Sequence, residues 1–232
     1  MVYLTRLVRR VHRGPIRKIF SYPLNEVNPV VFFEITVEGD ALGQVTIELF
    51  HDTVPKTSEN FRSLCTGERG FIQCPLYYKG IPFHRIIPGF IVQGGDILTK
   101  DGRGNVSVFG FPFLDESFKG KAGKHLPGTV AMAHSGPNQN GSQFFFNMRR
   151  NEHLDGKYVV CGQVLEGWDL VERVAALCGS RCGCASESCV GSRIAGRASG
   201  AKLEEAQRAL CGERALHSMP GKEVLDLISP RY

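Results

Sequence analysis

The sequence predicts a mainly β protein, an antiparallel barrel capped at its ends by two α-helices. Three observations predict this fold. The chain contains many short runs rich in β-branched and aromatic residues, two segments have helical periodicity, and the first two runs are joined by a connection typical of a hairpin. These runs cover residues 30–37 and 43–50, and Glu38, Gly39 and Asp40 connect them.

The remaining elements follow in chain order. Pro55 begins a helix at a position where its missing N–H costs nothing, and Gly67 ends it. Phe61, Leu64 and Cys65 give this helix a buried face. A second helix is predicted at residues 168–177. Further strands are predicted at residues 82–86, 91–94, 128–133, 143–147, 158–164 and 192–198.

Length and charge limit the possible functions. A chain of 232 residues suits one domain of ordinary size with appendages. The formal net charge is +5, but six of the 28 basic residues lie in the first 25 positions, which contain no acidic residue. The other 22 basic residues face 23 acidic residues, so we expect no nucleic-acid partner for the folded part. No apolar run approaches the length of about 18 residues that spans a membrane, so we expect no membrane insertion.

The N-terminal extension, residues 1–28, has the pattern of a basic amphipathic helix. Apolar residues between Leu4 and Val11 share one helical face, five arginines fall on the opposite side, and Gly14 and Pro15 end the helix. An arginine-rich segment without acidic residues is typical of a mitochondrial transit peptide, so we predict a mitochondrial location. The alternative is a basic tail on a cytoplasmic protein.

The C-terminal extension, residues 204–232, follows the predicted domain at residues 29–203. Leu203, Ala206 and Leu210 share one face of a short predicted helix, and Gly212 is placed to end it. This helix either packs on the barrel of its own chain or docks a partner. A protein complex formed through the termini is therefore one expectation.

Three sequence blocks carry the strongest functional signal. Residues 83–96 read FHRIIPGFIVQGGD, residues 131–146 read AMAHSGPNQNGSQFFF, and residues 152–164 read EHLDGKYVVCGQV. Together with residues 31–70, these blocks resemble the cyclophilin family of peptidyl-prolyl cis-trans isomerases. The resemblance covers residues 29–203. It implies an eight-stranded closed antiparallel β-barrel capped by two α-helices, a monomer, and no cofactor or metal.

Isomerisation of an X-Pro bond needs a donor and a pocket, and no nucleophile. The rotation barrier is about 18–20 kcal/mol because the nitrogen lone pair is conjugated with the carbonyl group. A hydrogen-bond donor aimed at the prolyl nitrogen lowers this barrier while an apolar pocket holds the ring. Arg85 suits the donor role because its guanidinium stays charged and projects several N–H groups.

The resemblance implies roles for a set of residues around this chemistry. The catalytic set is Arg85, Phe90, Gln93 and Phe145, and the substrate-binding set is Ile91, Ala133, His134, Gln143, His153, Leu154 and Tyr158. Phe90 and Phe145 would wall the proline pocket, and Gln93 would hold the arginine or bond a substrate carbonyl. His134 would act chiefly through its backbone, which would pair with the substrate as an added strand. Each residue taken singly has an ordinary structural explanation, so the functional interpretation rests on their joint spacing.

Four positions differ from the commonest family pattern. Ile91 replaces a methionine, His134 an asparagine, His153 a tryptophan and Tyr158 a histidine. Isoleucine is stiffer than methionine but similar in volume, and tyrosine keeps an aromatic ring, so we expect an active pocket. His153 lacks the large aromatic face and indole donor of tryptophan, so we expect weakened affinity for the cyclic peptide cyclosporin.

The eight cysteines do not form an evenly spaced disulfide framework. Four of them lie together in a Gly/Ser-rich segment: Cys178, Cys182, Cys184 and Cys189. Because paired C-x2-C knuckles are absent, we expect a thiol-rich loop here, with a zinc site as the alternative. Cys74, in the lengthened loop at residues 72–78, is expected to be a free thiol, with a redox switch as the alternative.

Two functions follow from these patterns. The first is a peptidyl-prolyl cis-trans isomerase that acts on proline-containing peptides and unfolded proteins and so assists folding. The alternative is a proline-peptide-binding or assembly module of a larger complex. The enzyme is favoured by the retained set Arg85, Phe90, Gln93 and Phe145. The module is favoured by the altered rim at His134, His153 and Tyr158.

Overall fold

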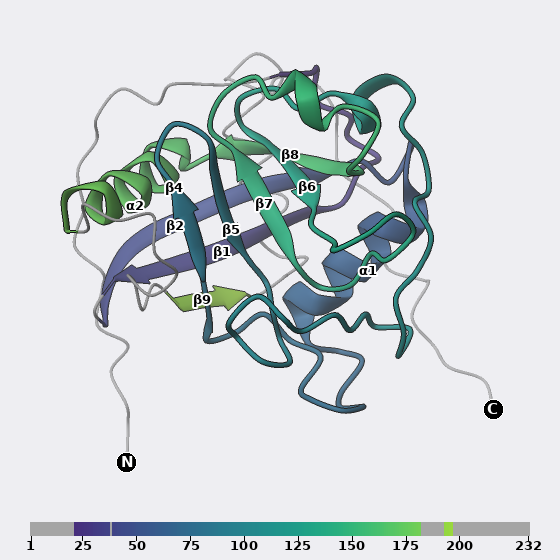
Figure 1. Cartoon of the computed structure of the whole chain (residues 1–232), viewed down its shortest axis with the longest axis horizontal. Coiled ribbons are helices and arrows are strands. Elements are labelled where there is room, and N and C mark those ends of the chain that lie inside the picture. Colours follow the sequence, from purple (N-terminus) through teal and green to yellow (C-terminus); the bar gives the residue numbers. More distant parts are fainter. Residues whose placement is uncertain (1–20, 38, 182–192, 197–232) are drawn as a thin grey trace, which may run out of the picture. The chain divides into compact units, whose positions relative to one another are not determined.

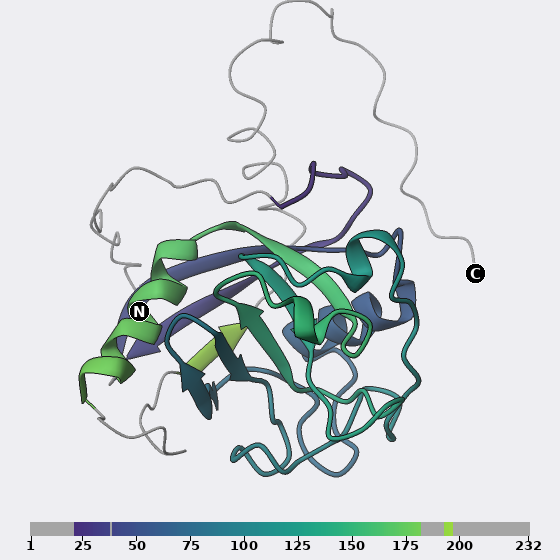
Figure 2. The ribbon, with the colours of Figure 1, turned by 45° about the horizontal axis from the view of Figure 1, so that its top comes forward.

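The described chain forms one antiparallel sheet and two helices (Figures 1 and 2). A computed structural model describes residues 21–37, 39–181 and 193–196. The strands are β1 (Val30–Val37), β2 (Asp40–Leu49), β3 (Ile81–Pro82), β4 (Arg85–Ile87), β5 (Ile91–Gly94), β6 (Thr129–Met132), β7 (Phe144–Asn147), β8 (Val160–Glu166) and β9 (Arg193–Gly196). The helices are α1 (Pro55–Thr66) and α2 (Trp168–Arg181), with 3-10 helices η1 (Gly120–Gly123) and η2 (Glu152–Leu154). The predicted mainly β class with two α-helices is confirmed.

The sheet has nine strands where the resemblance implied eight. Its hydrogen-bonded order is β3-β9-β1-β2-β8-β6-β7-β5-β4. The two end strands, β3 and β4, are consecutive in the chain and are joined only by Phe83 and His84. The predicted single strand at residues 82–86 is therefore wrong, because the chain changes partner there from β9 to β5. The described strands form a curled sheet, and its hydrogen-bonded order does not close into a barrel.

Aromatic packing inside the curl explains its shape. Successive side chains of a strand point to opposite faces, so Phe144 and Phe146 of β7 point inward while Phe145 points outward. Phe144 stacks on Phe33 of β1 at a centroid distance of 5.4 Å. Phe61 of α1 also contacts Phe144, at 5.1 Å. Three strands separate β1 from β7 in the sheet, so this contact requires the sheet to bend around its core.

The two helices lie at opposite ends of the curled sheet (Figures 1 and 2). As predicted, α1 begins at Pro55 and buries Phe61, Leu64 and Cys65. Gly67 ends it in the left-handed region, with φ of 73°, and donates its N–H to the carbonyl oxygen of Ser63. α2 packs against β2 and β4. Neither of these helices is long and apolar enough to cross a bilayer.

Residues 21–28 contact the sheet, although the sequence assigns them to the N-terminal extension. Glu48 of β2 is fully buried and accepts hydrogen bonds from the backbone N–H of Asn25 (3.1 Å) and from Asn28 Nδ2 (2.8 Å). Gln163 of β8 donates to the other oxygen of Glu48 (2.8 Å) and exchanges two 2.9 Å hydrogen bonds with the backbone of Tyr22.

Several predicted features lie outside the described residues. They are the helix within residues 1–20, the thiols Cys182, Cys184 and Cys189, and the extension at residues 204–232. Cys74, by contrast, is one of the described residues, and it is a free, buried thiol, as predicted.

Candidate functional site

Three predicted site residues form one row across the outer face of the sheet. Arg85 on β4 pairs with Gln93 on β5, and Gln93 pairs with Phe145 on β7. Directly paired residues of antiparallel strands project from the same face, so these side chains stand side by side. Ile91 lies two residues before Gln93 and shares this face. The row runs from an exposed cation through a half-buried amide to a buried ring.

Arg85 offers its donors to solvent. Its side chain is exposed, and no described residue forms an ion pair or hydrogen bond with its guanidinium. Gln93 is committed elsewhere, because its Nε2 donates to Gln143 Oε1 at 3.0 Å. The arginine fork is therefore available to a ligand, and Gln93 is fixed beside it.

Gln143 connects the row to a loop that we call the Asp96 loop, residues 96–104. Its Nε2 donates to the carbonyl oxygens of Gly102 (2.8 Å) and Gly104 (2.7 Å). Its backbone carbonyl accepts a 2.8 Å hydrogen bond from the N–H of Ala133. Gln143 thereby joins β5, the end of β6 and the Asp96 loop at one point.

One buried carboxylate organises the Asp96 loop. Asp96 accepts hydrogen bonds from four backbone N–H groups, those of Leu98, Thr99, Gly102 and Gly104, and from the Thr99 hydroxyl. Burial alone would raise the pKa of Asp96, but these hydrogen bonds, led by those from Thr99, lower it to about 2. A side chain at position 104 would clash with Asp96, since an added Cβ would lie 2.1 Å from its Oδ1.

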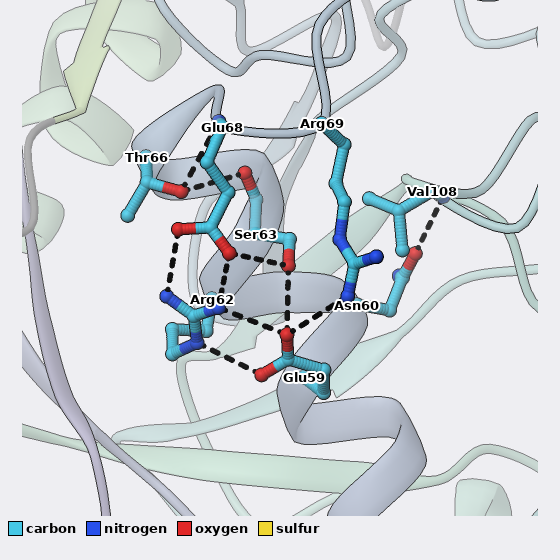
Figure 3. Close-up of polar contacts among 8 residues, drawn as sticks. All are labelled: Glu59, Asn60, Arg62, Ser63, Thr66, Glu68, Arg69 and Val108. Carbon is cyan, nitrogen blue, oxygen red and sulfur yellow. Dashed lines mark hydrogen bonds and ion pairs between the residues drawn. The ribbon is translucent and has the colours of Figure 1, made fainter. Parts of the chain in front are cut away.

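A second buried anchor supports the loops beside the row. Asn60 of α1 is fully buried, donates from Nδ2 to the carbonyl oxygen of Gly141 (2.9 Å) and accepts from the N–H of Val108 (3.0 Å; Figure 3). The segment before β7 is therefore fastened to α1. Arg62 of the same helix forms partly exposed ion pairs with Glu59 and with Glu68, which follows the helix (Figure 3).

Five rings of the predicted site lie in two contacting groups, which we together call the aromatic wall: Phe90, His134, Phe145, His153 and Tyr158. Phe145 meets Tyr158 edge to face at 5.6 Å, and Tyr158 stacks on His134 at 4.6 Å. Phe90 stacks on His153 at 5.5 Å, and the Arg149 guanidinium lies 5.6 Å from the Phe90 centroid. Leu154, next to His153 in η2, is partly buried against the core.

The imidazole of His134 holds two loops together. Its Nε2 donates to the carbonyl oxygen of Lys157 at 3.0 Å, and it lies 3.7 Å from Asp115 Oδ1. Only 5% of the side chain is exposed. The ring is therefore buried and its Nε2 is bonded within the protein, so a ligand can reach only the backbone at this position.

A pocket of about 530 Å³ adjoins the aromatic wall. It is lined by Asp115, Phe118, residues 134–138 and residues 156–158. His134 and Tyr158 are the two predicted site residues in its lining. This pocket lies beside the Arg85 row and does not contain it.

Sequence reasoning missed three residues that hold the site. Asp96 and Asn60 are described above, and the third is His125, whose fully buried ring stacks on Phe145 at 5.9 Å. The only available sequence signal for Asp96 was its place directly after Gly94 and Gly95, ahead of further glycines. Asn60 and His125 bond partners far away in the chain, so no local pattern could identify them.

Comparison with known proteins gives two findings. The family model described as "Cyclophilin type peptidyl-prolyl cis-trans isomerase/CLD" matches residues 32–187. The chain is also 52% identical over 149 residues to peptidyl-prolyl cis-trans isomerase cyp11 of Rhizopus delemar, in an alignment that covers 63% of this chain. That alignment spans 44% of the relative, less than half of its length.

Proposed function

The chain belongs to the cyclophilin-type peptidyl-prolyl cis-trans isomerase family, and we propose that it accelerates rotation about X-Pro bonds in peptides and unfolded proteins. The observation that carries the proposal is the row of Arg85, Gln93 and Phe145 across β4, β5 and β7. In this row a free cationic donor stands next to an apolar surface. These are the two components that the reaction needs.

The proposed mechanism uses Arg85 as the donor. Partial double-bond character resists rotation, and it is lost as the prolyl nitrogen becomes pyramidal and its lone pair is no longer conjugated with the carbonyl group. A guanidinium N–H directed at this lone pair interacts more strongly with the twisted state than with either planar isomer. The barrier falls because this interaction is specific to the transition state.

The aromatic wall supplies the surface that would hold the proline ring. Phe145 and Ile91 are buried on the face of the row, with Phe90 and Leu154 partly buried next to them. Gln93, fixed by Gln143, would orient Arg85 or bond a substrate carbonyl. While the ring is held, the acyl side of the bond is free to turn.

Turnover of a short X-Pro peptide by the full chain tests the proposal, with Arg85→Ala as the variant. Loss of one charged donor is expected to lower kcat/KM by about 100-fold or more. Arg150→Ala is the matched control, because Arg150 is exposed and its partner is Glu152. Turnover no faster than buffer would reject the proposal, and so would an Arg85→Ala variant as active as the parent.

The alternative function, a proline-peptide-binding or assembly module, makes a different prediction in the same assay. A module would bind the peptide without accelerating its isomerisation. The altered rim supports this alternative, since His153 stacks on Phe90 with a smaller ring than tryptophan and without an indole donor. For the same reason we propose weakened affinity for cyclosporin.

We also propose a mitochondrial location, which rests on the arginine-rich, acid-free sequence of the first residues. A fluorescent protein fused after residue 28 tests it. Mitochondrial fluorescence supports the proposal, and diffuse cytoplasmic fluorescence overturns it.

A further inference from the structure

A buried histidine lies directly behind the aromatic wall. The His125 side chain is fully buried. Its ring stacks on Phe145 with a centroid distance of 5.9 Å and an interplanar angle of 12°. The same ring meets Tyr158 edge to face at 6.5 Å. Because Phe145 and Tyr158 also contact each other, the three rings form one cluster in which His125 is the innermost member.

Asp155 fixes the orientation of this ring. The imidazole Nδ1 lies 3.0 Å from Asp155 Oδ1, and the backbone N–H of His125 donates to the same oxygen at 2.9 Å. Lys124 lies 3.3 Å from the other carboxylate oxygen. Asp155 belongs to the segment that also contains His153, Leu154 and Tyr158.

His125 makes a second connection to the same segment. Its carbonyl oxygen accepts the N–H of Asn151 at 2.9 Å, directly before η2. Asn151 Nδ2 reaches the carbonyl oxygen of Phe90 at 3.4 Å. His125 thus connects Phe145 to the segment that carries His153, Leu154 and Tyr158.

The charge state of the pair supports a fixed geometry. Burial lowers the pKa of His125, so the imidazole is neutral near pH 7. Burial alone would raise the pKa of Asp155, but hydrogen bonds from His125 and Lys124 together outweigh it and the pKa falls. A neutral ring donates from Nδ1 to the carboxylate and keeps one orientation.

A purely structural role does not explain this residue. The other ring nitrogen, Nε2, is buried and has no hydrogen-bond partner in the described part of the chain. An unsatisfied polar atom costs stability, and an apolar ring would fill the same space without that cost. The histidine adds what an apolar ring cannot supply, a hydrogen bond that fixes the ring plane against Asp155.

We propose that His125, held by Asp155, is a positioning residue that preforms the proline-binding surface. It sets the plane of Phe145 and the place of the segment that carries His153, Leu154 and Tyr158. It contacts Phe145, which holds the proline ring, and no contact between described residues joins it to the donor Arg85, so we expect substrate binding to change more than kcat. This inference rests on the proposed function and names a determinant of its substrate binding.

The experiment compares the parent with His125→Phe and Asp155→Asn in the full chain. His125→Phe keeps a stacked ring and removes the hydrogen bond, and Asp155→Asn keeps the shape and removes the charge. We expect KM to rise by about tenfold in each variant, with kcat within about twofold of the parent. His51→Ala is the matched control, because His51 is exposed and lies outside the site.

Two further measurements keep the result interpretable. Affinity for a short Ala-Pro peptide, measured by NMR titration, reports the surface even where turnover is absent. The double variant should bind no more weakly than either single variant, since Asp155 acts through His125. Unchanged affinity in both single variants would overturn the inference, and so would a fall in kcat at constant KM. A parent that binds without turnover would reject the proposed function alone.

Discussion

The two sides of the candidate site are held by different forces. The aromatic wall is maintained by ring contacts at 4.6–5.6 Å, which depend on volume and shape. The Asp96 loop is maintained by hydrogen bonds that converge on a single carboxylate. Several rings each contribute part of the packing of the aromatic wall, whereas the conformation of the Asp96 loop depends on one side chain, Asp96.

The family resemblance shows the same contrast. All four departures from the commonest pattern lie in the aromatic wall or on the face of the row: Ile91, His134, His153 and Tyr158. Gln93 and Gln143, which lead to the Asp96 loop, match the pattern. A packed surface accepts a different side chain when its neighbours can repack around it, but a set of convergent hydrogen bonds has no equivalent substitute.

The largest expected effect comes from removing the floor of the aromatic wall. Phe145→Ala deletes a ring that is 3% exposed and should lower the free energy of unfolding by about 3–5 kcal/mol. Urea unfolding measures this change. Phe111→Ala is the control, because Phe111 is 64% exposed and its loss should cost less than about 0.5 kcal/mol. Equal losses would show that the wall is not part of the packed structure.

Removing the single acceptor of the Asp96 loop should have the next largest effect. Asp96→Asn places an amide among groups that all donate, and should cost about 1.5–3 kcal/mol in the free energy of unfolding. kcat/KM should fall as well, because Gln143 loses the fixed carbonyl oxygens of Gly102 and Gly104. Asp101→Asn, in the same loop but on its exposed side, is the control for both measurements. An Asp96→Asn variant as stable and as active as the parent would show that the loop does not depend on this single carboxylate.

Acid should weaken the Asp96 loop selectively. The pKa of Asp96 is lowered in the folded protein from 3.8 to about 2. Its contribution to stability is therefore complete above about pH 5 and is lost as pH falls toward 2, where Asp96 also becomes protonated in the folded protein. The difference in unfolding free energy between the parent and Asp96→Asn should shrink between about pH 5 and pH 3. A constant difference would show that the carboxylate charge is not what holds the loop.

The smallest effect is expected from the ion pairs on α1. The pKa of Glu59 is lowered to about 2, mainly by its hydrogen bonds to Arg62, yet about 31% of its side chain is exposed (Figure 3). Solvent screens such pairs, so Glu59→Gln should cost less than about 1 kcal/mol in urea unfolding and leave kcat/KM unchanged. Asn60→Ala is the informative neighbour, because it removes two buried hydrogen bonds from the adjacent position. A Glu59→Gln variant as unstable as Asn60→Ala would reverse this order.

The sequence alone predicted the elements whose signals are local. The limits of α1 follow from Pro55 and Gly67, and the strand predicted at residues 143–147 is found as β7. The site residues could be named because their spacing resembles a known family. The register that aligns Arg85, Gln93 and Phe145 depends on the pairing of Gln93 with Phe145, 52 positions away, which local periodicity does not encode.

What remained hidden was the support behind those residues. His125 and Asp155 meet across 30 positions of sequence, and Asn60 reaches Gly141 across 81. The split of the predicted strand at residues 82–86 was equally hidden, because β9 lies more than a hundred positions away. Each case is a tertiary contact that overrides a local pattern.

The contacts of residues 21–28 set the N-terminal limit of a fragment that can fold like the full chain. A fragment starting at residue 29 would remove two of the three residues that donate to the fully buried Glu48. Gln163 would also lose its exchange with Tyr22. A buried carboxylate that loses two of its hydrogen bonds destabilises the fold, because the charge stays out of reach of water. A truncation at residue 29 would therefore expose the domain to unfolding and proteolysis, whereas a cut before Ser21 would leave these contacts in place.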